Sequence, residues 1–191
     1  EVCRLLALPL PQKRPPPGAK KLLPTEWKPL HYDSAFPDAF LSNLRARGHA
    51  AVSRPVLGRY AAVHVRRGDV SKAAALTHRG FARYVDLSYF KHMYAYVREQ
   101  GISDIHLFSE ESARAELARE FPDCVLHLGD RSGEAEAWTY MIHADILVLS
   151  PSSFSFVPAL FNRSTVIYKP FWHRQLPQWL NGDDIVTRRT T

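Results

Sequence analysis

Cysteines, unbroken apolar runs and clustered charges of one sign are all scarce in this chain of 191 residues. The two cysteines, Cys3 and Cys124, have no spacing typical of a zinc cluster or a redox pair, so they indicate neither. The longest uncharged stretch, residues 146–162, is interrupted by prolines and serines. It is also shorter than the roughly 20 apolar residues that cross a bilayer, so we expect no transmembrane helix.

Basic residues outnumber acidic ones, with a formal net charge of +6 and an isoelectric point near 9.5. This excess favours an anionic partner, such as a nucleotide diphosphate, a nucleic acid or an acidic surface. The basic residues are scattered, and no nucleic-acid-binding motif accompanies them, so nucleic acid is not an expected partner. The chain begins at Glu1 rather than methionine, which predicts a fragment or a processed form.

The chain divides into two parts by composition. Residues 1–58 hold most of the prolines and are expected to form an irregular extension, with a short helix at residues 38–47. Residues 59–191 carry regular hydrophobic periodicity and are expected to form one domain. The triplet Asn162-Arg163-Ser164 matches the glycosylation sequon, a pattern short enough to arise by chance.

In the second part, short apolar strands alternate with amphipathic helices. Strands are predicted at residues 59–65, 104–108, 124–128, 145–149 and 165–168, and helices at 87–100, 109–121, 134–143 and 153–161. Such alternation predicts an α/β fold with a Rossmann-like parallel sheet and helices on both faces.

The hexapeptide His64-Val65-Arg66-Arg67-Gly68-Asp69 begins in the last two residues of the first of these strands and places two adjacent arginines directly after it. Ligand-binding groups of α/β sheets lie at the carboxyl ends of strands, where a guanidinium can pair two N–H groups with phosphate oxygens. An arginine pair alone is more typical of a solvated strand end that pairs with surface carboxylates.

A serine-rich segment, residues 150–156, follows the fourth strand and opens a helix. Backbone N–H groups and the helix dipole make such a helix start an anion site, and small hydroxyl groups add hydrogen-bond donors. The alternative is an ordinary helix cap in which Ser152 or Ser153 satisfies the backbone and nothing binds. Because both segments end strands of one sheet, they are expected to converge on one diphosphate.

The hexapeptide resembles the His-x-Arg-Arg-Gly-Asp motif of the fucosyltransferases that make α1,2-, α1,6- and protein O-linked fucose. Residues 144–161 resemble a later motif of that superfamily, in which a Ser-Ser-Phe-Ser run opens a helix. The similarity covers roughly residues 58–170. It implies the donor-binding, C-terminal half of a GT-B architecture, residues 1–58 then being an extension or a remnant of the acceptor-side domain. It also implies a secretory or Golgi location.

The resemblance further implies GDP-fucose as donor, a glycan or glycoprotein as acceptor, and no cofactor or metal. Arg67 would contact the β-phosphate and stabilise the departing GDP, assisted by Arg66. Asp69 would be the nearest general base. The donor-binding residues that the resemblance implies are His64, Arg66, Arg67, Ser152, Ser153 and Ser155.

A carboxylate can accept hydrogen bonds from the donor edge of guanine. Asp130, Glu134 and Glu136 follow the third strand, and Asp130 is the candidate for this contact. The α1,6 enzymes have a glutamate shortly after the arginine motif, whereas residues 70–75 contain no acid. Two alternatives therefore stay open: a non-catalytic module that binds a nucleotide or glycan, and a GT-B transferase using another nucleotide sugar.

Overall fold

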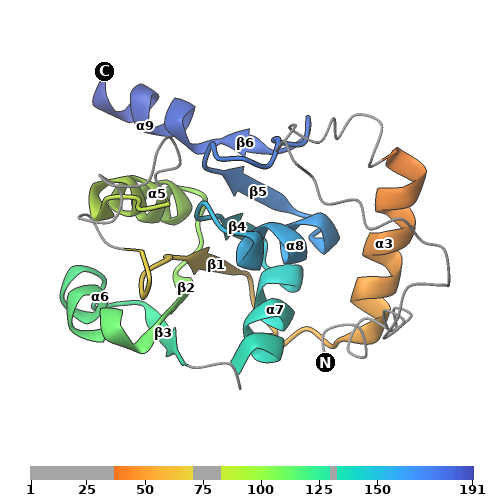
Figure 1. Cartoon of the computed structure of the whole chain (residues 1–191), viewed down its shortest axis with the longest axis horizontal. Helices are drawn as coiled ribbons and strands as arrows, with labels where there is room; N and C mark the ends of the chain where they lie inside the picture. Colours follow the sequence, from red (N-terminus) through yellow and green to blue (C-terminus); the bar gives the residue numbers. More distant parts are fainter. Residues whose placement is uncertain (1–36, 71–82, 130–132) are drawn as a thin grey trace, which may run out of the picture.

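The computed structural model describes residues 37–70, 83–129 and 133–191. Within them, six strands form one parallel sheet in the order β3-β2-β1-β4-β5-β6 (Figure 1). The strands are β1 (Tyr60–His64), β2 (Asp104–Ser109), β3 (Val125–Leu128), β4 (Ile146–Val148), β5 (Thr165–Tyr168) and β6 (Leu180–Asn181). The predicted α/β, Rossmann-like fold class is confirmed.

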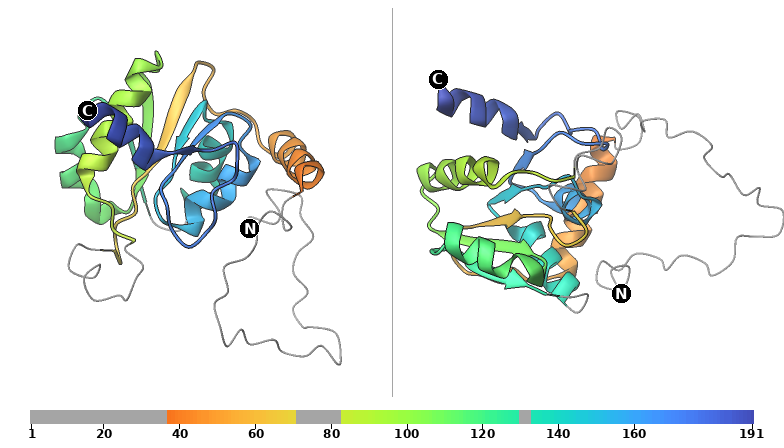
Figure 2. Two further views of the ribbon diagram at one scale, coloured as in Figure 1. Left: turned by 90° about the horizontal axis from the view of Figure 1, so that it is seen from above. Right: turned by 60° about the vertical axis from the view of Figure 1, so that its left-hand side comes forward.

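Helices cover both faces of the sheet (Figures 1 and 2). One face carries α5 (Leu87–Glu99), the short 3-10 helix η1 (Glu111–Ala113), α6 (Arg114–Glu120) and α9 (Gly182–Thr190). The other face carries α7 (Glu134–His143) and α8 (Ser153–Phe161), against which α3 (Asp38–Ala51) packs. None of the described helices is long and apolar enough to span a bilayer.

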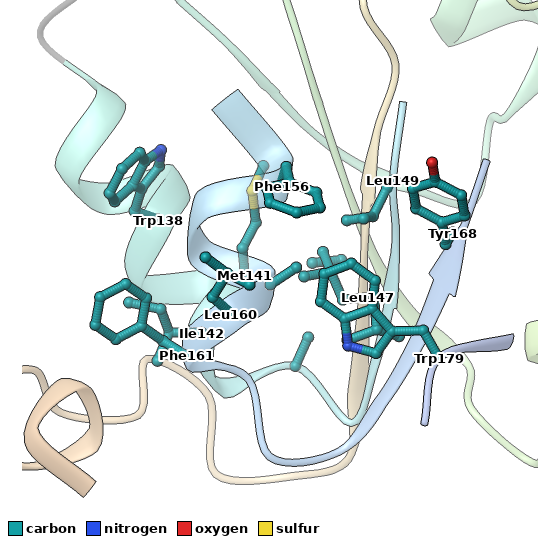
Figure 3. Packing of buried hydrophobic residues seen from close by; sticks show 14 of the residues in the cluster. Trp138, Met141, Ile142, Leu147, Leu149, Phe156, Leu160, Phe161, Tyr168 and Trp179 are labelled. Carbon is teal, nitrogen blue, oxygen red and sulfur yellow. The ribbon is translucent and has the colours of Figure 1, made fainter. Parts of the chain in front are cut away.

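β1 lies at the centre of the sheet and is buried along its whole length. Alternate side chains of a strand point to opposite faces, so Tyr60 and Ala62 join the core under α7 and α8. Ala61, Val63 and Val65 join the core under α5 and α6. Figure 3 shows the first of these cores, where side chains of α7 and α8 pack against β4.

The helix expected at residues 38–47 extends over Asp38–Ala51 and belongs to the folded domain. Leu41 is buried in the α7–α8 core, and Gly48 lies against Phe161 of α8. A Cβ atom at Gly48 would lie 2.5 Å from Cδ1 of Phe161, so glycine permits this close approach. The irregular extension predicted over residues 1–58 therefore contains a packed helix.

The last strand and the last helix of the structure were not expected from the sequence. The sequence did not predict β6 or α9, because β6 has only two residues and α9 buries only Gly182 and Ile185.

Asn162 of the sequon is 2% exposed, and its side-chain amide donates to the carbonyls of Met141 and Ala144, each at 2.9 Å. In the folded chain this amide nitrogen is structural rather than accessible for glycosylation.

Candidate functional site

Beside β1, the chain changes the direction in which it adds strands to the sheet. The chain passes from β1 outward to β2 and β3, and then α7 returns it to β4 on the other side of β1. The loops that follow β1 and β4 therefore lie side by side at the carboxyl edge of the sheet. Ligands of open α/β sheets bind at this kind of switch point.

A cavity of about 550 Å³ opens at this edge, over the ends of β1, β2 and β3 and beside the starts of α7 and α8. Its wall combines aromatic, basic and acidic side chains with two glycines. The lining residues are His64, Arg66, Phe108, Ser109, Glu110, Leu126, His127, Leu128, Gly129, Gly133, Glu134, Glu136, Ala137 and Phe154.

Arg66 lies on the cavity side of the sheet, together with His64. Its guanidinium forms ion pairs with Glu110 and Asp69, and 29% of its side chain is exposed. Asp69 is more exposed than Arg66, and its other oxygen lies 3.9 Å from Arg83. Asp69 thus holds Arg66 at the rim and does not itself line the cavity.

Arg67 points to the opposite face of the sheet, toward α6. Its Nε lies 3.2 Å from a carboxylate oxygen of Glu116, and its Nη1 donates to the carbonyl of Val85 at 3.2 Å. The guanidinium also lies over the ring of Tyr84, 4.7 Å from its centroid. The structure therefore brings Arg66 and not Arg67 to the cavity, and the phosphate contact expected of Arg67 stays a prediction.

Glu110, at the end of β2, was not singled out from the sequence because it stands among acids that suit a helix start. One of its carboxylate oxygens accepts the backbone N–H of Arg67 at 2.7 Å, and the other pairs with Arg66. The turn after the arginines passes close to it through Gly68, whose φ of +70° is costly for other residues. Glu110 thus fixes the arginine loop while lining the cavity.

His64 is buried beneath this loop, with 3% of its surface exposed. Its Nδ1 has no hydrogen-bond partner, and its ring lies 5.2 Å from the ring of Phe154. Burial, and to a smaller extent the charge of Arg66, lower the pKa of His64 to about 3. At neutral pH this side chain is therefore an uncharged hydrogen-bonding group in the cavity wall.

Ser150 joins the two neighbouring loops, a role the sequence did not indicate. Its hydroxyl donates to the carbonyl of His64 at 2.5 Å and accepts the backbone N–H of Arg66 at 3.0 Å. The residue is 1% exposed. This bridge sets the spacing between the β1 loop and the start of α8.

The predicted serines of α8 have different surroundings. Ser152 caps the helix by accepting the N–H of Phe154 at 3.2 Å. Ser155 is buried, and its hydroxyl lies 3.4 Å from the carbonyls of Ser150 and Ser152. Ser153 is exposed, with its hydroxyl 3.0 Å from Nε2 of His173. None of the three lines the cavity, to which α8 contributes Phe154.

The cavity wall also includes two carboxylates. Glu134 and Glu136, in the first turn of α7, both line it. Asp130, the sequence-based candidate for the base contact, lies outside the described residues. Arg66 and its partner Glu110 thus line the cavity on the side of α8, and the two carboxylates of α7 line it on the side of β3. Within the described ranges, no group of three or more His, Cys, Asp or Glu side chains is arranged to hold a metal ion.

Comparison with known proteins gave matches among solved structures only. No family model matches the sequence, and no curated protein sequence matches it. Crystal structures of POFUT1 match in two complexes with GDP-fucose, at 13% identity and TM-scores of 0.42 and 0.41. The alignments cover 65% and 73% of this chain, and 43% and 45% of POFUT1. A POFUT1 complex with GDP matches at 14% identity and TM-score 0.42, covering 73% of this chain and 46% of that one. The chain thus spans less than half the length of these proteins.

Proposed function

We propose that the cavity binds the nucleotide-sugar donor GDP-fucose and that the chain is the donor-binding part of a fucosyltransferase-like glycosyltransferase. The observation that carries this proposal is the cavity at the switch point of the sheet, lined by Arg66 on the side of α8 and by Glu134 and Glu136 on the side of α7. A nucleoside diphosphate has matching ends, since its phosphates are anionic and guanine presents an edge of N–H donors. The resemblance of the hexapeptide at His64–Asp69 to the fucosyltransferase motif favours this donor over other nucleotide sugars.

On the side of α8, the diphosphate would lie between Arg66 and the start of that helix. The Arg66–Asp69 pair is exposed enough that its net stabilisation is about 0–1 kcal/mol. A phosphate can replace Asp69 at little cost, because a guanidinium binds phosphate oxygens in pairs. The unpartnered Nδ1 of His64 would supply a further hydrogen bond nearby.

On the side of α7, Glu134 and Glu136 would accept hydrogen bonds from the donor edge of guanine. Phe108 and His127 are stacked with their ring centroids 4.5 Å apart, and both line the cavity. They form part of the cavity wall that the base would contact. Asp130 remains a candidate for the same contact.

The proposed reaction transfers fucose to a hydroxyl of a glycan or glycoprotein. The acceptor oxygen forms a bond to the anomeric carbon of fucose while the bond from that carbon to the β-phosphate oxygen breaks. The departing GDP takes the electron pair, and Arg66 stabilises the charge that develops on it. Asp69 is the proposed general base for the acceptor proton, and no metal or cofactor is invoked. Arg67 would take part only after its guanidinium leaves Glu116.

Calorimetric titration of the chain with GDP, GDP-fucose and UDP-sugars tests donor binding. We expect GDP and GDP-fucose to bind more tightly than UDP-sugars, and no GDP binding would overturn the proposal. A Glu110→Gln variant provides a directional check, since it removes a negative charge beside Arg66 while retaining an acceptor for the Arg67 N–H. GDP affinity should increase in this variant, and a decrease would place the phosphates elsewhere.

A non-catalytic nucleotide-binding module is the second candidate, and the state of the acids near Arg66 favours it. Glu110 is held by Arg66 and by the backbone of Arg67, and Asp69 is paired with Arg66. A general base must first leave these partners. Measuring GDP release from GDP-fucose in the presence of glycan and protein acceptors separates the candidates, because the module would bind GDP-fucose without releasing GDP.

A further inference from the structure

Two histidines from neighbouring strands form a hydrogen-bonded pair beneath the cavity. Nδ1 of His106, on β2, lies 2.8 Å from Nε2 of His127, on β3. Tyr140 of α7 covers both rings, with centroid distances of 4.7 and 4.8 Å, and Phe108 stacks on His127. His106 is buried, whereas His127 is one-fifth exposed at its side chain and lines the cavity.

The pair has two possible arrangements of its protons. A neutral imidazole carries one N–H donor and one acceptor nitrogen, so one ring must donate to the other. If His127 donates through Nε2, its Nδ1 is left as an acceptor. If His106 donates instead, Nδ1 of His127 carries a proton. Carboxylates near the two outer nitrogens decide between these arrangements, because a carboxylate favours an N–H group over a lone pair.

Asp104 is the stronger of the two carboxylate neighbours. Its Oδ1 lies 3.0 Å from Nε2 of His106, off the line of a well-formed hydrogen bond but in close electrostatic contact with a buried ring. Glu136 lies 3.9 Å from Nδ1 of His127, beyond hydrogen-bonding distance, and its side chain is 66% exposed. Coulomb interactions weaken with distance and with solvent screening, so Asp104, which is closer to its histidine and less exposed, at 41%, favours a proton on Nε2 of His106.

We propose that Asp104 and His106 are positioning residues that fix His127 with its proton on Nε2, so that Nδ1 is a hydrogen-bond acceptor in the cavity wall. The ligand group that it accepts from is an N–H of a planar heteroaromatic ring. This ligand assignment rests on the proposed function, in which the ring is guanine. The arrangement of protons itself does not depend on any ligand.

The electrostatic surroundings of His127 agree with an uncharged ring. Burial, followed by the neighbouring His106, lowers the pKa of His127, and Glu136 opposes this effect more weakly. At pH 7 the ring is therefore neutral, which is the state in which one nitrogen is free to accept.

Two-bond ¹H–¹⁵N correlation spectra of the ¹⁵N-labelled chain at pH 7 test the proton arrangement directly. Both histidines should show the proton on Nε2, and a proton on Nδ1 of His127 would overturn the proposal. Asp104→Ala should increase the Nδ1–H form of His127, whereas Glu136→Ala should leave the Nε2–H form dominant. The reverse response of the two variants would show that Glu136 is the anchor.

GDP titration tests the acceptor role separately. Loss of one neutral hydrogen bond should weaken GDP binding about threefold to tenfold in Asp104→Ala. Glu99→Ala is the control, since it removes an equal charge from a residue that pairs with Arg189 on the opposite face. Unchanged GDP affinity in an Asp104→Ala chain whose tautomer has changed would refute the acceptor role. If the wild-type chain binds no GDP, the proposed function fails while the spectra still decide the proton arrangement.

Discussion

Alanine substitution of the two adjacent arginines should produce opposite effects on stability and binding. Arg66 lines the cavity with a part-exposed side chain, and Arg67 is 6% exposed on the other face of the sheet. The two variants remove the same charge from neighbouring positions. Each is therefore the matched control for the other.

Arg67→Ala should mainly lower the free energy of unfolding. The substitution breaks the contact with Glu116, the hydrogen bond to the carbonyl of Val85 and the cation–π contact with Tyr84. Hydrogen bonds to charged groups contribute about 1.5–3 kcal/mol each, but Glu116 is 37% exposed and partly rehydrated after the loss. A net loss of about 3 kcal/mol is expected, which lowers Tm by about 6–12 °C in a chain of this length.

Arg66→Ala should leave Tm within a few degrees of wild type, because its pairs with Glu110 and Asp69 are part-exposed and contribute roughly 1 kcal/mol or less. GDP affinity should instead fall about tenfold to a hundredfold, the equivalent of one charge-assisted phosphate contact. Thermal unfolding measures the first quantity and calorimetric titration the second. An Arg67→Ala chain that keeps its Tm but loses GDP affinity would refute the assignment of the two side chains to opposite faces.

Three further predictions concern the stability of the fold. Burial lowers the pKa of His64 to about 3, whereas the unfolded chain has the ordinary value of about 6.5 and takes up a proton below it. Stability should therefore fall below pH 6.5 by up to about 1.4 kcal/mol per pH unit toward pH 3. Denaturation of His64→Gln should show a shallower decline with pH, and equal slopes would contradict this. Asn162→Ala should lower the urea midpoint by the equivalent of about 2 kcal/mol, because two buried carbonyls lose their donor. Gly48→Leu should cost about 1–3 kcal/mol by overpacking against Phe161, while Gly58→Ala, with open space around it, should be nearly neutral in the same urea titration.

Much of the sheet was predictable, because β1 to β5 are apolar runs and the helices between them have clear periodicity. α7, α8 and β5 begin and end at the predicted residues. The switch-point location followed from the same pattern, since the two polar motifs each directly follow a strand. Local sequence was sufficient where hydrophobic burial decides the structure.

The sequence did not indicate which arginine faces the cavity. That choice depends on the register of β1, where Tyr60 and Ala62 face α7 and α8, and a shift of one residue would exchange the two side chains. Glu110 and Ser150 were missed for a related reason. Both residues act through contacts with residues more than 40 positions away in the sequence. Neither stands out among the acids or serines beside it.

The packing of α3 on α8 makes α3 part of the folded structure that holds the cavity. α8 is nine residues long, with Phe154 in the cavity wall near its start and Phe161 against α3 at its end. A domain excised at β1 would lack α3 and would expose Phe161, which packs against Gly48, to water. Transplanting this sheet with its cavity into another protein would therefore require the segment from Asp38 onward, since α3 and the cavity wall both pack on the short helix α8.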